Sequence, residues 1–296
     1  MSVISSLTPA QISALPLSVI ANLSTTDIES LSSSQVAALS GTQVNALNST
    51  DLQAFSATQV AAFSPSVFHV LLTLQSFSST EITEFTNTEI SALTATEIGT
   101  LTTTELQGLS TAQENALTTT QIASLTTTVL NNLTTGQIGE LTTAQVHALT
   151  PAQLNGLSAT NLDALAVTAL TNAQLSGLNA TGILNLSTTQ VSGLTPTQIG
   201  LLSVADINAL STGEVAAFST GQAAALTSTQ IAGITTTNFS ALTATTGIPA
   251  LSIQAIGGLT ASDIDALTTI QGNAFTTAQI QAMSSSVISA LITLTG

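Results

Sequence analysis

An apolar residue, most often leucine, returns every eight residues along most of this chain. The series runs in four stretches, over residues 7–63, 77–157, 170–234 and 251–283. They start 33 units of the form L-[ST]-x-x-[QED]-[IVL]-x-[AG], as in residues 117–124. A short and regular period indicates a repeat architecture in which each unit is one small structural element.

The polar residues of the unit carry the signature of a helix start. Ser, Thr or Asn follows the leading apolar residue in 32 of the 33 units, and Gln, Glu or Asp comes three residues later in 25. This is the pattern of a capping box, in which two side chains satisfy amides left free at a helix N-terminus. The apolar residues on either side of the box form a hydrophobic staple. Four prolines fall at the first helical position, where proline is best tolerated: Pro9, Pro65, Pro151 and Pro196.

We therefore predict an all-α fold, a solenoid or superhelix of short capped helices, each bent from the last at its cap. One continuous helix is disfavoured, because an eight-residue period drifts by about 80° per unit around a straight helix. A β-solenoid is disfavoured because the apolar spacings of the unit, 5 and 3, are odd, whereas the inward residues of a strand have even spacings. Helices this short are marginal alone, so each has to bury its apolar pair against neighbouring units.

Three segments break the register: residues 71–76, 165–169 and 242–250. The same unit continues on both sides of each break, so we predict one repeat domain over residues 1–296. We interpret the breaks as insertions or deletions at corners of the solenoid. The alternative is that they set bends, or expose apolar side chains such as Leu71, Leu72 and Leu74 for subunit contact.

The composition excludes several classes of function. The chain has fifteen acidic residues and no lysine, arginine or cysteine. Binding to nucleic acid or to an anionic membrane surface depends mainly on Lys and Arg, so we expect neither partner. Without cysteine there is no disulfide framework and no thiolate nucleophile. No apolar run is long enough to span a membrane, and residues 1–7 lack the features of a Sec-type signal peptide.

Nine of the fifteen acidic residues stand at the box position, the fifth of the unit. There we expect them to cap an amide and to complement the helix dipole. Four of them recur at consecutive units: Glu81, Glu89, Glu97 and Glu105. If these form a carboxylate ladder on one edge, their oxygens are candidate ligands for Ca²⁺, although no EF-hand or nonapeptide calcium pattern is present.

Catalytic chemistry finds little support in the sequence. His69 and His147 share one position of the unit, where we expect them to face solvent, and neither has a cysteine or a fixed carboxylate partner. No G-x-S-x-G nucleophile elbow occurs. We therefore expect no enzyme, no catalytic residue and no cofactor.

Taken whole, the chain is rich in Thr, Ser and Ala, acidic, and free of lysine and cysteine. In this it resembles the repetitive segments of large secreted bacterial surface proteins, namely adhesins and S-layer-type proteins. The resemblance is one of composition; it implies secretion and a structural or adhesive role, and transfers no site.

Our leading hypothesis is a structural protein that assembles with copies of itself into an extracellular filament, sheath or surface layer. The apolar and uncharged residues 287–296, and a start that is nearly as bare, favour end-to-end association. The alternative is a monomeric, adhesin-like module at the cell surface. Such a module presents its threonine hydroxyls and methyls to a glycan or to ice.

Overall fold

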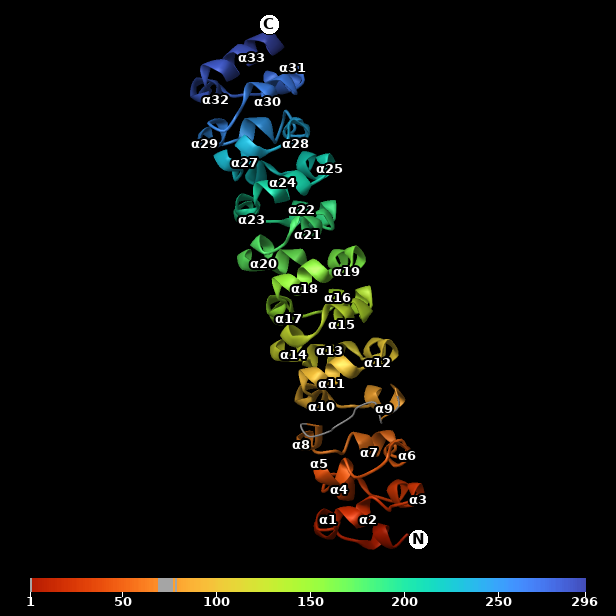
Figure 1. Ribbon diagram of the computed structural model, residues 1–296. Helices are drawn as coiled ribbons and strands as arrows, with labels where there is room; N and C mark the ends of the chain where they lie inside the picture. Colours follow the sequence, from red (N-terminus) through yellow and green to blue (C-terminus); the bar gives the residue numbers. More distant parts are fainter. Residues whose placement is uncertain (1, 69–76, 78) are drawn as a thin grey trace. The chain divides into compact units, whose positions relative to one another are not determined.

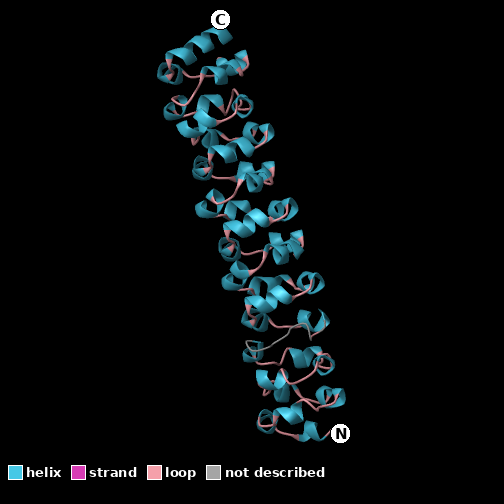
Figure 2. Cartoon of the chain, viewed as in Figure 1, coloured by secondary structure: helices cyan, strands magenta, loops and turns pink. Residues whose placement is uncertain are grey.

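The structure of this protein is a computed structural model that describes residues 2–68, 77 and 79–296. Within these residues every regular element is helical: 33 short α-helices and three 3-10 helices, with no strand (Figure 2). The predicted all-α repeat fold is therefore confirmed.

The chain divides into two compact units, Met1–Ala148 and Leu149–Gly296. Figure 1 labels the helices along the chain. The first contains η1 (Val3–Ser6), α1 (Pro9–Ser13), α2 (Leu17–Ile20), α3 (Thr25–Glu29), α4 (Ser33–Val36), α5 (Gly41–Val44), α6 (Ser49–Leu52), α7 (Ala57–Val60), α8 (Pro65–Phe68), α9 (Ser79–Thr83), α10 (Asn87–Ala92), α11 (Ala95–Thr100), α12 (Thr103–Gly108), α13 (Thr111–Ala116), α14 (Thr119–Ser124), α15 (Thr127–Asn132), α16 (Thr135–Gly139) and α17 (Thr143–Ala148). The second contains α18 (Pro151–Gly156), α19 (Ala159–Ala164), η3 (Val167–Ala169), α20 (Asn172–Ser176), α21 (Ala180–Leu184), α22 (Thr188–Gly193), α23 (Pro196–Leu201), α24 (Val204–Ala209), α25 (Thr212–Ala216), α26 (Thr220–Ala224), α27 (Ser228–Gly233), α28 (Thr236–Ser240), η4 (Ile248–Ala250), α29 (Ile253–Ile256), α30 (Ala261–Asp265), α31 (Thr269–Gly272), α32 (Thr277–Ala282) and α33 (Ser285–Thr295). Both are built from short helices that repeat every eight residues, and the single domain over residues 1–296 stays a prediction.

Most of the described helices begin at a Ser or Thr cap, and many end at the leading apolar residue of the next octad. In α14 the Thr118 hydroxyl accepts from the Gln121 amide at 3.2 Å, and Gln121 Oε1 accepts from the Thr118 amide at 2.6 Å. Thr118 is extended, with ψ at 157°, and so is Leu125 at the other end, with ψ at 142°. Leu125 is followed directly by the extended cap residue Thr126, so two consecutive extended residues bend the chain between α14 and α15. No described residue has a positive φ, so this bend does not require glycine.

Three helices make one turn of the stack in each unit. In the first unit α9 contacts α12, and α12 contacts α15; in the second α20 contacts α23, and α23 contacts α26. The helix three octads later in the sequence is thus the neighbour in the next turn. The staple residues point inward, since Ile122 has no exposed surface and Leu125 is buried. This arrangement supplies the neighbours that two-turn helices need.

A row of phenylalanines replaces the leading leucines on either side of the first register break. Phe55 and Phe63 have ring centroids 5.0 Å apart, Phe63 and Phe77 are 6.4 Å apart, and Phe77 and Phe85 are 5.6 Å apart, all edge to face. This is a favourable geometry for aromatic pairs. The break at residues 71–76 itself, with Leu71, Leu72 and Leu74, lies outside the described residues, as does His69.

The second and third register breaks each form a 3-10 helix that occupies the place of an α-helix in the stack. The 3-10 helix η3 contacts α22, and η4 contacts α26, so that the spacing of three elements is kept. Val167 and Ile248 are buried there. At the second of these, a Cβ on Gly247 would lie 2.7 Å from the Thr243 nitrogen, so the close turn of main chain requires glycine.

Candidate functional site

Glutamine at the box position bonds in two directions. In α27, Gln230 Oε1 accepts from the Thr227 amide at 2.8 Å and completes the cap of its own helix. Its Nε2 donates to Ile199 O at 2.9 Å and to Leu202 O at 2.7 Å, at the end of α23. Those carbonyls belong to the last turn of a helix, where main-chain acceptors lack partners within the helix. One side chain therefore caps its own helix and joins it to the turn before.

The same inter-turn bond recurs in both units, from a glutamine to carbonyls 28 and 31 residues earlier. In each case Nε2 donates to both carbonyls, as seen for Gln35, Gln59, Gln121, Gln145, Gln222 and Gln279. Asn238 donates in the same way to Ile207 O and Leu210 O. The capping half of this contact is predictable from the octad; the inter-turn half was missed, because it joins residues that are far apart in sequence.

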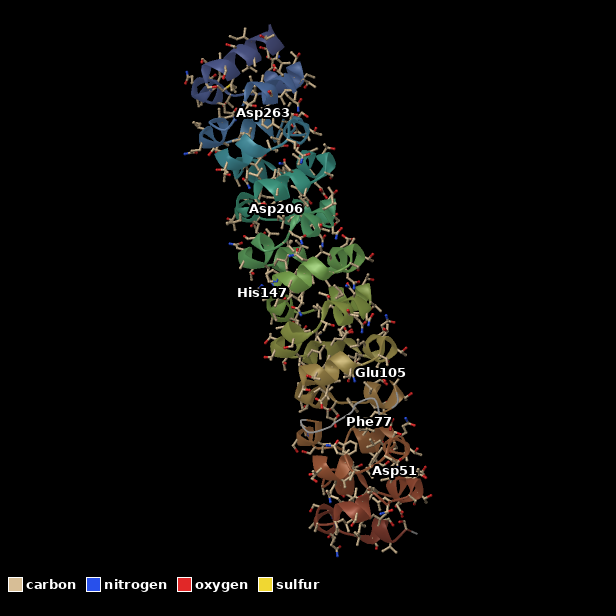
Figure 3. All side chains as sticks on the ribbon, in the orientation of Figure 1. Asp51, Phe77, Glu105, His147, Asp206 and Asp263 are labelled. Atoms are coloured by element: carbon tan, nitrogen blue, oxygen red, sulfur yellow. The ribbon has the colours of Figure 1, made fainter. Side chains whose placement is uncertain are left out.

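Most acidic side chains at the box position complete the cap of their own helix. Figure 3 labels four of the box acids, and each lies in the first turn of its helix: Asp51, Glu105, Asp206 and Asp263. Among the four candidate calcium ligands, Glu89 accepts from the Thr86 amide at 2.6 Å, Glu97 from Thr94 at 2.5 Å and Glu105 from Thr102 at 2.7 Å. These contacts agree with the capping role expected from the sequence.

The helices that carry the four candidates do not all follow one another in neighbouring turns on one side of the stack. Successive units occupy successive sides of a turn, so only Glu81 and Glu105, on the contacting helices α9 and α12, are in neighbouring turns on one side. The neighbour of α10 is α13, and that of α11 is α14. Among the described residues no three His, Asp or Glu side chains come together in a way that suits a metal ion. Calcium binding by these residues stays a prediction.

A carboxylate at the box position has no hydrogen to offer the preceding turn. Glu89 is 1% exposed, and its Oε1 is buried with no hydrogen-bond partner. Burial raises the pKa of Glu89 above its usual value, against the effect of the bonds from Thr86. Units with an acid at the box are therefore less firmly joined to the turn before than units with glutamine.

The structure also identifies Glu114, a residue that was not predicted from the sequence to have a particular role. It stands at the sixth position of its unit, where the consensus has Ile, Val or Leu, and it is the only charged residue at that position. Its side chain is 4% exposed, and Oε1 has no hydrogen-bond partner. Burial raises the pKa of Glu114 to about 7; the nearby charge of Glu140 acts in the same direction, and the Gln137 amide opposes it. The signal that reveals Glu114 is a carboxyl at a core position.

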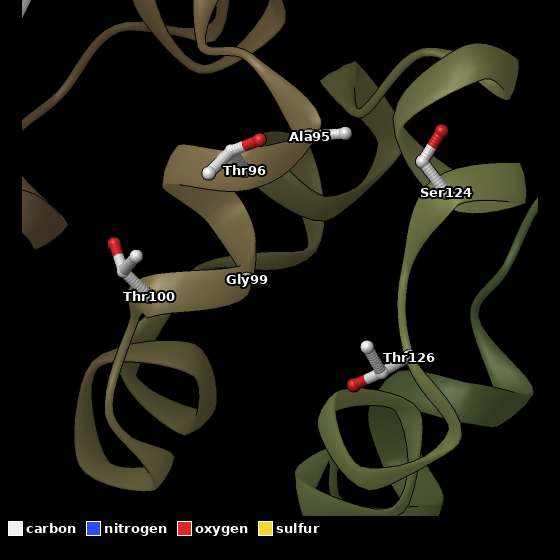
Figure 4. Close-up of a pocket in the computed structure, with 6 residues that line it drawn as sticks. All are labelled: Ala95, Thr96, Gly99, Thr100, Ser124 and Thr126. Carbon is white, nitrogen blue, oxygen red and sulfur yellow. The ribbon is translucent and has the colours of Figure 1, made fainter.

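A shallow hydroxyl-lined pocket lies on the outer surface of the first unit (Figure 4). It has a volume of 520 Å³ and is lined by residues of α11, α14 and the cap after α14: Ala95, Thr96, Gly99, Thr100, Ser124 and Thr126. Two of its hydroxyls already donate to the main chain, Thr100 to Glu97 O at 2.7 Å and Ser124 to Thr120 O at 2.9 Å. Its lining has hydroxyls and methyls but no charge, which suits a neutral polar ligand.

His147 lies in the last turn of α17 and is exposed, as expected (Figure 3).

None of the described helices combines the length and the apolar character that crossing a bilayer requires.

The fold and its inter-turn contacts define a class of protein: an all-helical tandem-repeat protein in which three capped helices make each turn and side-chain amides join successive turns. The model of the ALTTAQ repeat family matches residues 20–49, 130–159 and 202–236. Its six letters correspond to the end of one octad and the start of the next, as in residues 116–121, which read A-L-T-T-T-Q. A comparison with curated proteins finds no match.

Proposed function

We propose that this chain is a structural protein that assembles with copies of itself into an extracellular filament, sheath or surface layer. The observation that carries the proposal is the inter-turn bond of the box glutamines, which recurs with equivalent donors and acceptors in both units. Because this hydrogen bond forms between successive turns within the chain, the same donors and acceptors can also bond between turns of two different chains.

The two faces of a turn are complementary rather than identical. One face offers main-chain carbonyls at helix ends, such as Ile199 O and Leu202 O, and the other offers side-chain amides such as Gln230 Nε2. Wherever a stack of such turns ends, it therefore presents a donor face or an acceptor face. Contacts between unlike faces are heterologous, and they build an open filament if the rotation does not close.

The chain's chemistry supports assembly by apolar and hydrogen-bonding contacts. Its formal net charge is −15 and it has no cationic side chain, so that charge opposes the approach of two copies. Salt screens this repulsion, and we expect it to favour association. The compositional resemblance to secreted surface proteins supports a location outside the cell.

Sedimentation velocity over a range of protein and salt concentrations tests the proposal. We expect species much larger than the 29.7 kDa chain, growing with protein concentration and persisting at high salt. A single species of one chain's mass at every concentration would contradict self-assembly.

A second candidate function is adsorption of a neutral polar surface or glycan by a monomeric module. The hydroxyl-lined pocket between α11 and α14 is the observation that favours it. On this alternative, Thr96→Tyr abolishes adsorption to glycan or ice without unfolding the chain. Thr189→Tyr is the matched control, since Thr189 is an exposed residue of α22 in the second unit. Equal adsorption by both variants and the parent chain would exclude this pocket as the site.

A further inference from the structure

Glu114 places a carboxyl where most of the described units have a buried aliphatic side chain. The equivalent residues in the units on either side, Leu106 and Ile122, are 1% and 0% exposed. Glu114 is hardly more exposed, and one of its oxygens has neither solvent nor a hydrogen-bond partner. A buried charge in this position is unfavourable unless it is paired, and the chain contains no Lys or Arg to pair with it.

The carboxyl also intrudes on an inter-turn bond. Gln137 caps α16 by accepting from the Thr134 amide at 2.9 Å, and its Nε2 donates to Leu106 O at 2.8 Å. In the repeating pattern the second Nε2 hydrogen goes to the carbonyl 28 residues earlier, which here is Leu109 O. Gln137 Nε2 makes only the bond to Leu106 O, and the nearby Gln137 amide lowers the pKa of Glu114 against the effect of burial. The ionised carboxyl thus competes with the main chain for a hydrogen that joins two turns.

The charged groups on elements around α13 do not neutralise Glu114. Glu140 follows α16 and is negative, so its charge disfavours ionisation of Glu114. Glu89 on α10 is also acidic and bonds the Thr86 amide of its own cap. On α17, Gln145 donates to Glu114 O at 2.7 Å, while His147 is exposed. None of these groups therefore pairs a positive charge with Glu114.

We propose that Glu114 is a proton-operated switch for the joint between α16 and the end of α12, where Gln137 bonds Leu106 O. When protonated, Glu114 is neutral in its apolar position, and the second Gln137 hydrogen is free to return to the main chain. When ionised, it holds that hydrogen and leaves a buried charge with an unpaired oxygen, and the joint loosens. The device depends on this one unit of the stack, and it operates whether or not the chain self-assembles.

The direction of the pH dependence follows from the raised pKa of Glu114. The folded chain retains the proton up to about pH 7, whereas an unfolded or opened segment releases it near the ordinary value of 4.5. The stabilisation is fully present below 4.5 and is lost as the pH rises through about 7. Between these values the ratio of closed to open joint falls about tenfold per pH unit. Asp27, whose pKa is lowered by the hydroxyls of Ser2 and Ser24, titrates below this window.

Hydrogen exchange of the full chain between pH 5 and pH 8 tests the switch, with rates corrected for intrinsic exchange. We expect protection of the α12 and α16 amides to fall with rising pH in the parent chain. In Glu114→Gln and in Glu114→Ile, the second of which restores the residue type of the octad, the fall in protection is reduced to the part that comes from Glu89, whose pKa is also raised by burial. Glu84→Gln is the matched control, because Glu84 is an exposed acid on the same unit of the chain, and it keeps the parent profile.

Two results would overturn the proposal. One is a parent profile that is flat across this range. The other is a profile that changes equally in Glu84→Gln and Glu114→Gln, since the effect would then come from net charge. If Glu114→Gln folds poorly, Glu114→Ile provides the same comparison with a side chain that the repeat normally carries there.

Discussion

At the scale of the residue, the box glutamine has two functions, one as a hydrogen-bond acceptor and one as a donor. Its oxygen satisfies an amide at the start of one helix, and its nitrogen satisfies two carbonyls at the end of another. Both groups lack partners within their own helices, as is usual at helix termini, and termini are frequent in a chain whose described α-helices other than α33 have four to six residues. An aspartate or glutamate keeps the first function and loses the second, as the buried and unpaired Oε1 of Glu89 illustrates.

This difference predicts the effect of Gln230→Glu. The variant retains the cap with Thr227 but faces Ile199 O and Leu202 O with an acceptor, so the inter-turn bonds are lost. We expect a destabilisation of about 2–4 kcal/mol at neutral pH, because buried acceptors are left without partners. Urea unfolding followed by circular dichroism measures it.

Gln11→Glu is the matched control for that variant. Gln11 forms the same cap with Thr8, but it is exposed, so we expect a change within about 0.5 kcal/mol. Equal losses in the two variants would mean that the cap, and not the inter-turn bond, is responsible.

At the scale of the element, the octad predicts what is local. The Ser or Thr cap, the box residue and the staple lie within six consecutive residues, so the helix starts and the buried positions follow from the sequence. The number of helices per turn does not follow, because it depends on contacts between units about 24 residues apart, as between α20 and α23. For the same reason the sequence does not show which of Glu81, Glu89, Glu97 and Glu105 lie in neighbouring turns on one side.

The register breaks illustrate the same limit. Irregular spacing at residues 165–169 and 242–250 is visible in the sequence, but the substitution of a 3-10 helix for an α-helix depends on the neighbouring turns. Glu114, in contrast, was detectable. It departs from the consensus at a position that the pattern already assigns to the core.

Two glycines make a pair that tests this description of the elements. In Gly247→Ala the new Cβ would lie 2.7 Å from the Thr243 nitrogen, so we expect a loss of about 1–3 kcal/mol. In Gly99→Ala the Cβ meets nothing within 4 Å and lies in α11, so we expect a gain of about 0.5–1 kcal/mol from the better helix former. Thermal unfolding measures both, and a gain in Gly247→Ala would contradict the tight turn before η4.

At the scale of the whole molecule, stability comes from the repetition of one contact. Each turn packs only on the turns next to it, so the free energy of each unit is close to a sum of turn and interface contributions. Five buried carboxyl side chains lie close together in the sequence of the first unit, on helices α9 to α13: Glu81, Glu89, Glu97, Glu105 and Glu114. We expect that part to open first at neutral pH, because its joints lack the glutamine bonds or compete for them.

The same repetition underlies the proposal of self-assembly, and it can be tested by imaging. Negative-stain electron microscopy of the purified full chain is the most direct measurement, because it distinguishes polymers from single chains without a ligand. If the chain self-assembles as proposed, we expect long and uniform filaments or sheets whose thickness is constant along their length. Discrete particles of single-chain size, at concentrations that saturate the grid, would contradict it.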